Sequence, residues 1–195
     1  MKKLYFFDFD GTLTYKDTMF LFLNFYDSKK FRLQFIKFIP LFVLLKLNLT
    51  NAEKVKKSFV SSILKGQSKS RIEKRAQDFF NSFYPDGIRQ NALDFMKNMD
   101  RTKTESYLVT ASLDIWVKPF AEKFQMQLIA TQAEFKNGVF TGNFIGSNCN
   151  GSEKVNRIKA VIADKKYDKT LGFGDTSGDQ EMLAWVNESH FKFFH

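Results

Sequence analysis

Residues 4–12 of this 195-residue chain read LYFFDFDGT, and this stretch decides the predicted fold class. The run Leu4–Asp8 is mostly apolar and is soon followed by Gly11, which is typical of a short buried strand in a parallel sheet. In an open parallel sheet, the ligand crevice lies at the carboxyl ends of the strands. We therefore expect Asp8 and Asp10 to point together into such a crevice.

The two aspartates, separated by one residue, can divide the work of a group-transfer reaction. One carboxylate can act as a nucleophile and form an acyl-phosphate, while the other gives a proton to the leaving group and then takes one from water. Gly11 lets the backbone come close to an anion. The alternative is an Asp-rich turn that merely ends a strand. However, a pattern with four fixed residue types, such as this one, has a probability of roughly 10⁻³ of occurring by chance in a chain of this length.

The predicted secondary structure changes near residue 84, from helices alone to alternating helices and strands. Residues 15–84 are predicted to be helical, with turns at 48–51 and 65–66. Beyond them, the expected helices are 88–99, 113–124, 153–163 and 180–186, and the expected strands are 107–110, 128–130, 170–173 and 190–193, with a hairpin of arms 133–136 and 139–141. This alternation favours an α/β fold with a doubly wound, Rossmann-like parallel sheet. Residues 1–14 and 85–195 would form this core, with 15–84 inserted after the first strand.

Two further motifs can serve a phosphoryl group. The segment LVTAS at 108–112 places the Thr110 hydroxyl and backbone amides at the end of a predicted core strand, although a strand that runs into a capped helix looks the same. The segment GSEK at 151–154 opens a helix with Lys154 one turn in. Lys154 can neutralise a nucleophilic carboxylate and a phosphate together, although a lone lysine usually faces solvent.

The segment GFGDTSGD at 172–179 predicts a metal site. Asp175 and Asp179 lie four residues apart, just beyond a predicted strand. Carboxylate oxygens without nitrogen or sulfur ligands suit Mg²⁺, which binds one or two carboxylates together with phosphate oxygens and water. The alternative for this pair is the acidic start of a helix.

Composition excludes several classes of protein. With 44% apolar and 26% charged residues, the chain is not disordered, and at 22.8 kDa it has room for one domain with a moderate insertion. Its single cysteine, Cys149, excludes a disulfide framework and a cysteine-rich zinc site. Two histidines leave little for a histidine-based metal site.

Charge is distributed unevenly along the chain. Residues 1–75 carry 16 Lys/Arg against 6 Asp/Glu, whereas residues 76–195 carry 14 against 15. A basic lobe suits nucleic acid, an anionic membrane face or a phosphorylated substrate, and the alternative is a solvated lysine-rich surface. A nucleic-acid partner is not expected, because the aromatic residues are predicted to lie in the core rather than on an exposed basic face.

The stretch Phe31–Leu49 is the most apolar part of the basic lobe. Its longest uninterrupted run, Phe38–Leu45, has eight residues, against the ~20 that a spanning helix needs. The apolar run after Lys3 is also too short for a signal peptide, so we predict a cytoplasmic protein. Residues 35–47 have two interpretations: a helix buried inside a bundle, or an apolar and basic surface that contacts an anionic membrane peripherally.

The ordered set DFDGT, LVTAS, GSEK and GDTSGD resembles the four motifs of the haloacid dehalogenase superfamily of phosphohydrolases. The resemblance covers nearly the whole chain, with 15–84 at the position of the helical cap of that family. The hairpin at 135–142 and the segments 149–151 and 181–183 resemble its subfamily IB, which includes the phosphoserine phosphatase-like enzymes.

The resemblance implies a Mg²⁺-dependent phosphomonoester phosphatase that forms an aspartyl-phosphate. The implied catalytic residues are Asp8 as nucleophile, Asp10 as proton donor and acceptor, and Lys154 as the neutralising cation. The implied phosphoryl-binding groups are Thr110 and the amides of Phe9, Gly11 and Ala111. The implied metal ligands are Asp8, the backbone carbonyl of Asp10, Asp175 and, through water, Asp179. Oligomeric state is not predicted.

The sequence leaves more than one class of substrate open. Phosphoserine enzymes of the family carry a Glu shortly after the first motif and an Arg in the cap, whereas here Asp17 is the nearest acid and residues 52–65 contain no arginine. Phosphatidylglycerophosphate phosphatases of the superfamily resemble this chain in Asp17, in the aromatic run 19–23 and in the apolar stretch 35–47. A lipid phosphate is therefore one expected substrate. Phosphoserine or another small metabolite is the alternative, and a phosphotransferase would use the same residues.

Overall fold

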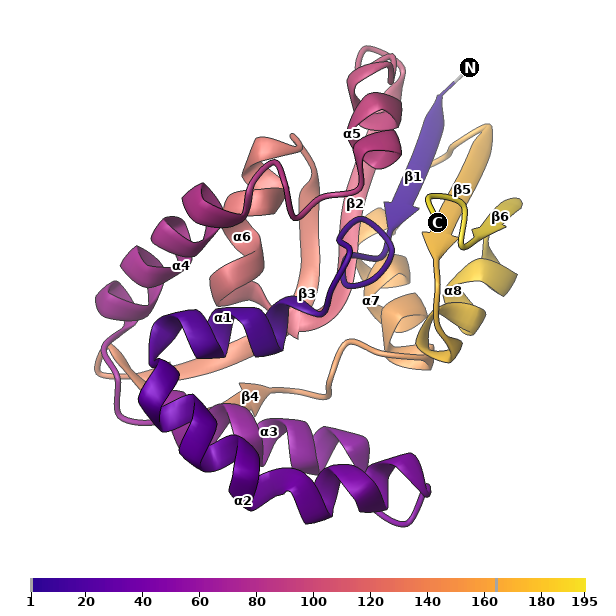
Figure 1. The fold of residues 1–195 in the computed structure, drawn as a ribbon. Coiled ribbons are helices and arrows are strands. Elements are labelled where there is room, and N and C mark those ends of the chain that lie inside the picture. The colour runs from indigo at the N-terminus through magenta and orange to yellow at the C-terminus, as the bar shows by residue number, and fades with distance from the viewer. Residues whose placement is uncertain (1, 164) are drawn as a thin grey trace.

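The computed structural model describes residues 2–163 and 165–195; residues 1 and 164, which belong to the predicted core segments, lie outside the described residues. Its centre is a six-stranded sheet of order β4-β3-β2-β1-β5-β6, in which only the edge strand β4 runs antiparallel to its neighbour (Figure 1). The strands are β1 Lys3–Phe7, β2 Thr104–Leu113, β3 Gln127–Lys136, β4 Val139–Ile145, β5 Lys169–Gly174 and β6 Glu188–Phe191. The predicted Rossmann-like α/β fold is confirmed.

Four helices lie between β1 and the rest of the core, and we call them the helical insertion: α1 Thr18–Tyr26, α2 Ser28–Lys46, α3 Ala52–Leu64 and α4 Lys69–Phe83. The remaining helices are α5 Gln90–Lys97, α6 Asp114–Lys123, α7 Ser152–Ile162 and α8 Gln180–Trp185, with the 3₁₀ turn η1 Ser177–Asp179 before α8. Asp17, Asp27, Asn51 and Ser68 cap the four insertion helices through side-chain oxygens.

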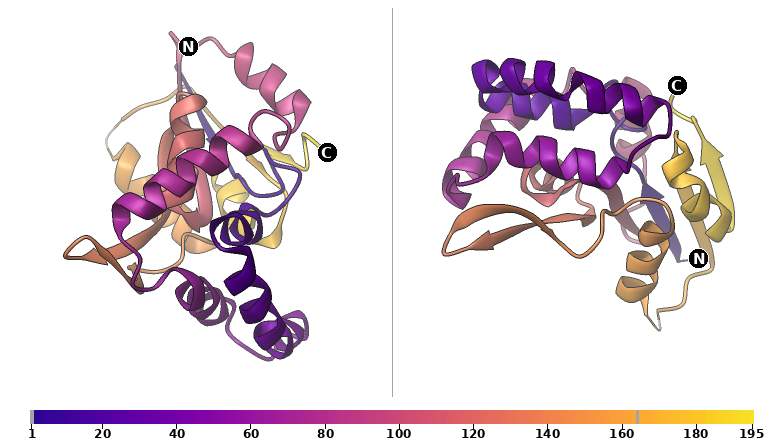
Figure 2. Two further views of the ribbon diagram at one scale, coloured as in Figure 1. Left: turned by 60° about the vertical axis from the view of Figure 1, so that its left-hand side comes forward. Right: turned by 90° about the horizontal axis from the view of Figure 1, so that it is seen from below.

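Alternation along β1 divides the core into two layers. Tyr5 and Phe7 point into a hydrophobic cluster shared with α5, α6 and the helical insertion. Leu4 and Phe6 point the other way, into a smaller cluster with α7 and α8. Helices therefore cover both faces of the sheet, as a buried parallel sheet requires, and the insertion extends beyond its carboxyl edge (Figures 1 and 2).

The hairpin differs from its prediction in one respect. The turn at Asn137-Gly138 has φ values of 49° and 74°, as the expected two-residue turn requires. The predicted strand 128–130 and the predicted first arm 133–136 are one continuous strand, β3. Residues 127–131 of β3 pair with β2 and residues 132–136 pair with β4, so the strand runs past the end of its parallel neighbour. The last strand, β6, also begins at Glu188 rather than at 190.

The extended hairpin packs against the α3–α4 turn of the helical insertion. Main-chain hydrogen bonds join the α3–α4 turn to β4, from the Gly66 N–H to the Phe140 carbonyl (3.0 Å) and from the Phe140 N–H to the Gln67 carbonyl (2.9 Å). A third runs from the Lys69 N–H to the Gly138 carbonyl (2.7 Å). A side chain at Gly142 would collide with the Ser61 hydroxyl, which shows how closely α3 packs on the hairpin.

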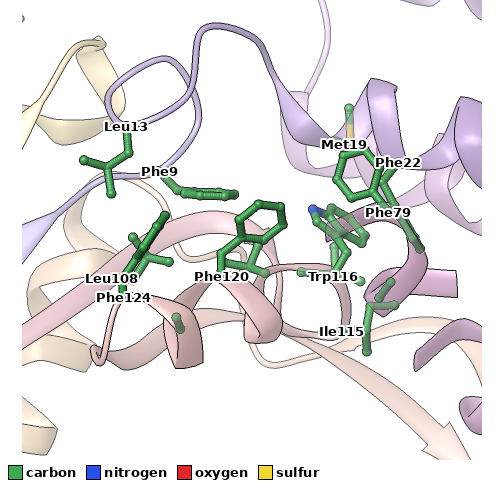
Figure 3. Packing of buried hydrophobic residues seen from close by; sticks show 14 of the residues in the cluster. Phe9, Leu13, Met19, Phe22, Phe79, Leu108, Ile115, Trp116, Phe120 and Phe124 are labelled. Carbon is green, nitrogen blue, oxygen red and sulfur yellow. The ribbon is translucent and has the colours of Figure 1, made fainter. Parts of the chain in front are cut away.

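Aromatic packing fixes the other end of the insertion to the core. Phe120 of α6 is fully buried, with ring centroids 4.9 Å from Phe80 and 5.1 Å from Phe9. Trp116, one turn earlier, stacks on Phe22 of α1 at 5.2 Å (Figure 3). These contacts join α1, α4 and α6 into a single apolar layer.

Helix α2 lies at the outer edge of the insertion. None of the residues of α2, all of which the structure describes, is buried. Its inner stripe, Phe31, Phe35, Phe38 and Phe42, packs on Phe59 of α3. The interpretation of residues 35–47 as the buried middle of a bundle is therefore wrong, because among the described residues α2 has neighbours on one side alone. Within the described part of the chain, no helix combines the length and apolar character needed to cross a membrane.

We expect Phe120→Ala to lower the free energy of unfolding by about 3–5 kcal/mol, because the change leaves a cavity at the junction of α4 and α6. Phe191→Ala is the matched control, since this side chain is 56% exposed and its loss should cost less than about 1 kcal/mol. Urea unfolding followed by circular dichroism measures both. Equal losses would show that Phe120 does not anchor the insertion.

Candidate active site

The predicted catalytic residues converge at the carboxyl edge of the sheet. Asp8 follows β1, Asp175 follows β5, Asp179 ends η1 and Lys154 lies in the first turn of α7. The Lys154 ammonium donates to Asp8 Oδ1 at 2.6 Å, to Asp179 Oδ1 at 2.6 Å and to the Val109 carbonyl at 3.0 Å. Its three donors are thus matched by three acceptors, and the Lys154 side chain is buried.

Burial and neighbouring charges have opposite effects on the pKa values of Lys154 and Asp8. Burial disfavours the charge on Lys154, but Asp8 and Asp179 outweigh that effect and raise the pKa of its ammonium above the usual value. Burial, only partly offset by Lys154, raises the pKa of Asp8 to about 7. The Lys154 ammonium alone therefore does not fully stabilise the negative charge of Asp8.

Asp8 belongs to a cluster of three carboxylates. Asp8, Asp175 and Asp179 each offer one oxygen, and these oxygens lie within 4.8 Å of one another. The Thr12 hydroxyl lies between two of them, 3.0 Å from Asp8 Oδ2 and 2.9 Å from Asp175 Oδ1. Gly11 passes so close that a side chain there would meet Asp175 Oδ2 at 2.5 Å, and its φ of +83° also favours glycine.

Asp179 is fixed on both of its oxygens. While Oδ1 accepts from Lys154, Oδ2 accepts from the N–H groups of Asp175 (3.2 Å) and Thr176 (3.0 Å) and from the Thr176 hydroxyl (3.0 Å). Burial alone would raise the pKa of Asp179, but Lys154 and Thr176 hold it below the usual value. Asp179 thus remains charged and holds Lys154 and the Asp175 loop in place.

Asp10 lies apart from this cluster, between the core and the insertion. Its Oδ1 accepts from the N–H and the hydroxyl of Thr18, both at 2.6 Å, and its Oδ2 accepts from the Ser112 hydroxyl at 2.6 Å. Thr18 is the first residue of α1, and the Trp116 indole donates to its hydroxyl at 3.3 Å. The carboxylate of Asp10 therefore connects β2 to the start of the helical insertion.

The predicted phosphoryl-binding groups differ in their surroundings. Thr110 and Ala111 line a cavity together with Asp8 and Asp10. The Phe9 side chain packs away from it, on Phe120. The Gly11 N–H donates to the Thr14 hydroxyl at 3.0 Å, so this amide already has a partner, whereas the resemblance implied that it binds a phosphoryl oxygen. The role of Gly11 visible here is steric, because it allows the close approach of Asp175.

The cavity has a volume of about 360 Å³ and two contrasting walls. Its floor is polar and comes from the core. Its roof comes from the insertion and is mostly apolar, formed by Met19, Phe20, Phe42, Leu45, Ala52 and Val55. Asp17 lies at the rim, where its Oδ1 accepts from the Met19 N–H at 2.8 Å. Although much of Asp17 is exposed, desolvation at the cavity and the nearby Asp10 raise its pKa to about 6.

Lys56 is a polar residue of the roof that the sequence analysis missed. From α3 its ammonium reaches the Ala111 carbonyl at 2.5 Å and Asn148 Oδ1 at 3.0 Å. Desolvation, partly offset by Asp10 and Asp17, lowers the pKa of Lys56 to about 8. In the sequence, nothing distinguishes Lys56 from Lys54 or Lys57, because only the packing of α3 decides which lysine faces inward. Thr18, Ser112 and Asn148 were also missed, because the tertiary arrangement of their own segments decides that they reach the site.

Comparison with known proteins decides the family. The sequence profile of the haloacid dehalogenase-like hydrolases matches residues 5–184. This chain is a haloacid dehalogenase-like hydrolase. The superfamily predicted from the four motifs is thereby confirmed.

Individual relatives of this haloacid dehalogenase-like hydrolase match nearly the whole chain. Protein CicA of Caulobacter vibrioides is 34% identical over 191 residues, which cover 96% of this chain and 85% of CicA. A Bordetella pertussis Tohama I protein with unknown function has the same fold, with a TM-score of 0.84, 20% identity and coverage of 97% and 89%. A phosphoserine phosphatase, solved as a phospho-aspartyl intermediate analogue, matches with a TM-score of 0.68, 20% identity and coverage of 96% and 85%. These structures share the fold of the chain.

The acidic cluster fits the Mg²⁺ that phosphatases of this family generally use. Its donors are carboxylate oxygens, which suit a hard cation. Five carboxylates, those of Asp8, Asp10, Asp17, Asp175 and Asp179, lie around two ammonium groups, those of Lys154 and Lys56, so negative charge is in excess. A divalent cation would offset that excess and favour the charged form of Asp8. Asp8 and Asp175 are the residues that would hold it, with Asp179 behind them.

We expect Mg²⁺ to raise the free energy of unfolding, by about 2.7 kcal/mol when its concentration is a hundred times the Kd. Asp175→Asn should remove most of this increment, since it deletes one charged donor. Asp78→Asn, on the exposed side of α4, should keep it. Thermal unfolding with Mg²⁺ or chelator measures the increment, and an unchanged increment in Asp175→Asn would exclude that residue as a ligand.

Proposed function

We propose that the protein is a Mg²⁺-dependent phosphomonoester phosphatase that acts through an aspartyl-phosphate on Asp8. The observation that carries the proposal is the position of Asp8, buried on the cavity floor between the Lys154 ammonium and the Thr12 hydroxyl. Asp10 stands on the same cavity, close to where a leaving group would sit. The arrangement provides a nucleophile, a neutralising cation and a proton donor in one enclosure.

In the first step, a carboxylate oxygen of Asp8 attacks phosphorus, and the bond from phosphorus to the leaving oxygen breaks. Lys154 keeps Asp8 oriented and offsets charge, while the Thr110 hydroxyl lies beside the path of the phosphoryl group. Asp10 gives its proton to the leaving oxygen. Bound Mg²⁺ would supply further neutralisation of the phosphoryl oxygens.

In the second step, water attacks the aspartyl-phosphate and releases phosphate, which restores Asp8. Asp10 takes the proton from this water. The hydrogen bonds from Thr18 and Ser112 orient the Asp10 carboxylate for this proton transfer. The position of α1 over the core would thereby control the proton donor.

For the substrate we propose a lipid phosphate, such as phosphatidylglycerophosphate. The apolar roof supports this class, because a leaving group that carries hydrocarbon would bury it against Phe20, Phe42 and Leu45. Two other aromatic residues of the insertion, Phe22 and Phe38, are not among the residues that line the cavity. Phe22 is fully buried on Trp116, and Phe38 packs on Phe59.

A small polar phosphate ester, such as phosphoserine, is the second candidate. Lys56 and Asp17 lie on the same cavity and carry opposite charge, as the two ends of an amino acid do. Lys56 supplies the cation that the missing cap arginine would otherwise provide. A phosphotransferase would differ only in passing the phosphoryl group to an acceptor alcohol, which product analysis with and without that alcohol distinguishes.

We expect Asp8→Asn to lower kcat toward phosphomonoesters by at least about a thousandfold, because the amide cannot attack phosphorus. Circular dichroism should show that the fold is retained. Asp78→Asn is the matched control and should retain full activity, since it lies on the exposed side of α4. If Asp8→Asn kept more than roughly a tenth of the activity, the covalent mechanism would be wrong.

We also expect kcat/KM for phosphatidylglycerophosphate in mixed micelles to exceed that for phosphoserine by at least about tenfold, because each buried methylene contributes about 0.8 kcal/mol. Phe42→Ser should narrow this ratio by weakening the apolar roof. Phosphatase assays on both substrates measure it. Efficient turnover of phosphoserine with no advantage for the lipid would favour the second candidate.

A further inference from the structure

The exposed side of α2 is unusual for a surface helix. Leu33, Ile36, Val43 and Leu47 recur at helical spacing and are 55%, 65%, 52% and 60% exposed. With Leu49, which is 69% exposed, they form what we call the outer face of α2. A helix that packs through one apolar stripe normally presents polar residues on the opposite side. Here both sides are apolar, and only the inner one has a partner in the described chain.

The charges around this face have a single sign. Residues 28–52 contain five Lys/Arg and no Asp or Glu. Four of these basic residues, Lys29, Arg32, Lys37 and Lys46, are exposed. The fifth, Lys30, donates to the Ile63 carbonyl at 2.8 Å and so ties α2 to α3. An apolar strip bordered by exposed cations therefore runs along the helix.

We propose that the outer face of α2 binds the surface of an anionic bilayer, with the helix lying in the plane of the headgroups. Exposed Leu, Ile and Val side chains would enter the boundary between headgroups and acyl chains, while the flanking lysines and Arg32 would contact anionic headgroups. A second copy of this chain is a poorer partner. A symmetric contact through this face would set its basic residues against one another without any acid in residues 28–52 to pair with them.

The outer face is continuous with the roof of the cavity. Phe42 and Leu45 line the cavity, and Val43 and Leu44, between them in sequence, are exposed. Bilayer and cavity would thus be separated by about the width of one helix, ~10 Å. Delivery of a lipid phosphate along this path rests on the proposed function, whereas binding of the bilayer by α2 does not.

Vesicle co-sedimentation with the full chain tests the proposal. The wild-type chain should bind vesicles that contain phosphatidylglycerol far better than vesicles of phosphatidylcholine alone, and added salt should weaken binding. The double variant Ile36→Gln/Val43→Gln should bind at least about tenfold more weakly. Val161→Gln, which alters a 44% exposed valine on α7, is the matched control and should bind like the wild type.

A second pair of changes probes the charges. Lys37→Glu/Lys46→Glu should lose the preference for anionic vesicles, and because both side chains are exposed, it also tests the proposal if the first variant folds poorly. Absence of vesicle binding by the wild type, or equal binding by all variants, would overturn the proposal. So would a dimer in analytical ultracentrifugation that Ile36→Gln/Val43→Gln dissociates, because a second copy would then cover the face.

Turnover of para-nitrophenyl phosphate, a water-soluble substrate, separates this proposal from the proposed function. The outer-face variants should keep wild-type turnover of this substrate, since none of the changed residues lines the cavity. Vesicle binding without any phosphatase activity would leave the bilayer contact standing and remove the proposed function. Phosphatase activity without vesicle binding would do the reverse.

Discussion

The buried ammonium of Lys154 holds together the segments that form the catalytic floor. It comes from α7 and is bound by the loops that follow β1 and β5 and by a carbonyl of β2. A charge in this position tolerates no missing partner, because an unpaired buried ion costs several kcal/mol. The carboxyl ends of three neighbouring strands are therefore held in register by one side chain. The geometry around Asp8 follows from this constraint.

The floor of the cavity is polar, and its roof is mostly apolar. The floor consists of groups whose hydrogen bonds are matched within the core, so it has little freedom to adapt. The roof consists of side chains from α1, α2 and α3 that meet the cavity mainly through apolar contact. Recognition of phosphate and recognition of the remainder of a substrate thus belong to separate parts of the chain. Asp10, bound by both Thr18 and Ser112, lies where the two parts meet.

Much of the fold and floor could be predicted from the sequence because the chemistry lies next to strand ends. Asp8 and Asp175 follow short apolar runs, so a parallel sheet places both at its carboxyl edge, and the adjacency of β1 and β5 brings them together. Local signals were also sufficient for the hairpin turn at Asn137-Gly138. They could not show that β3 continues past β2, because strand length there depends on pairing with β4.

Other features depend on tertiary packing and leave no local signal. The Gly11 amide could not be recognised as occupied, because its acceptor is the hydroxyl of Thr14 and the loop conformation decides that contact. Lys56 looks like any surface lysine until α3 is placed against the hairpin. The apolar residues of α2 are compatible with burial or exposure, and only the arrangement of α1 and α3 determines which occurs.

The main-chain hydrogen bonds between the α3–α4 turn and β4 have an evolutionary consequence. Bonds between Gly66, Gln67 and Phe140 use backbone atoms, so they position the insertion without specifying its side chains. Mutations can therefore accumulate along the roof while the roof stays over the same floor. A lineage that keeps the hairpin and the floor can acquire new substrates by drift in α2 and α3 alone. Diversification of this kind requires no intermediate that has lost its catalytic residues.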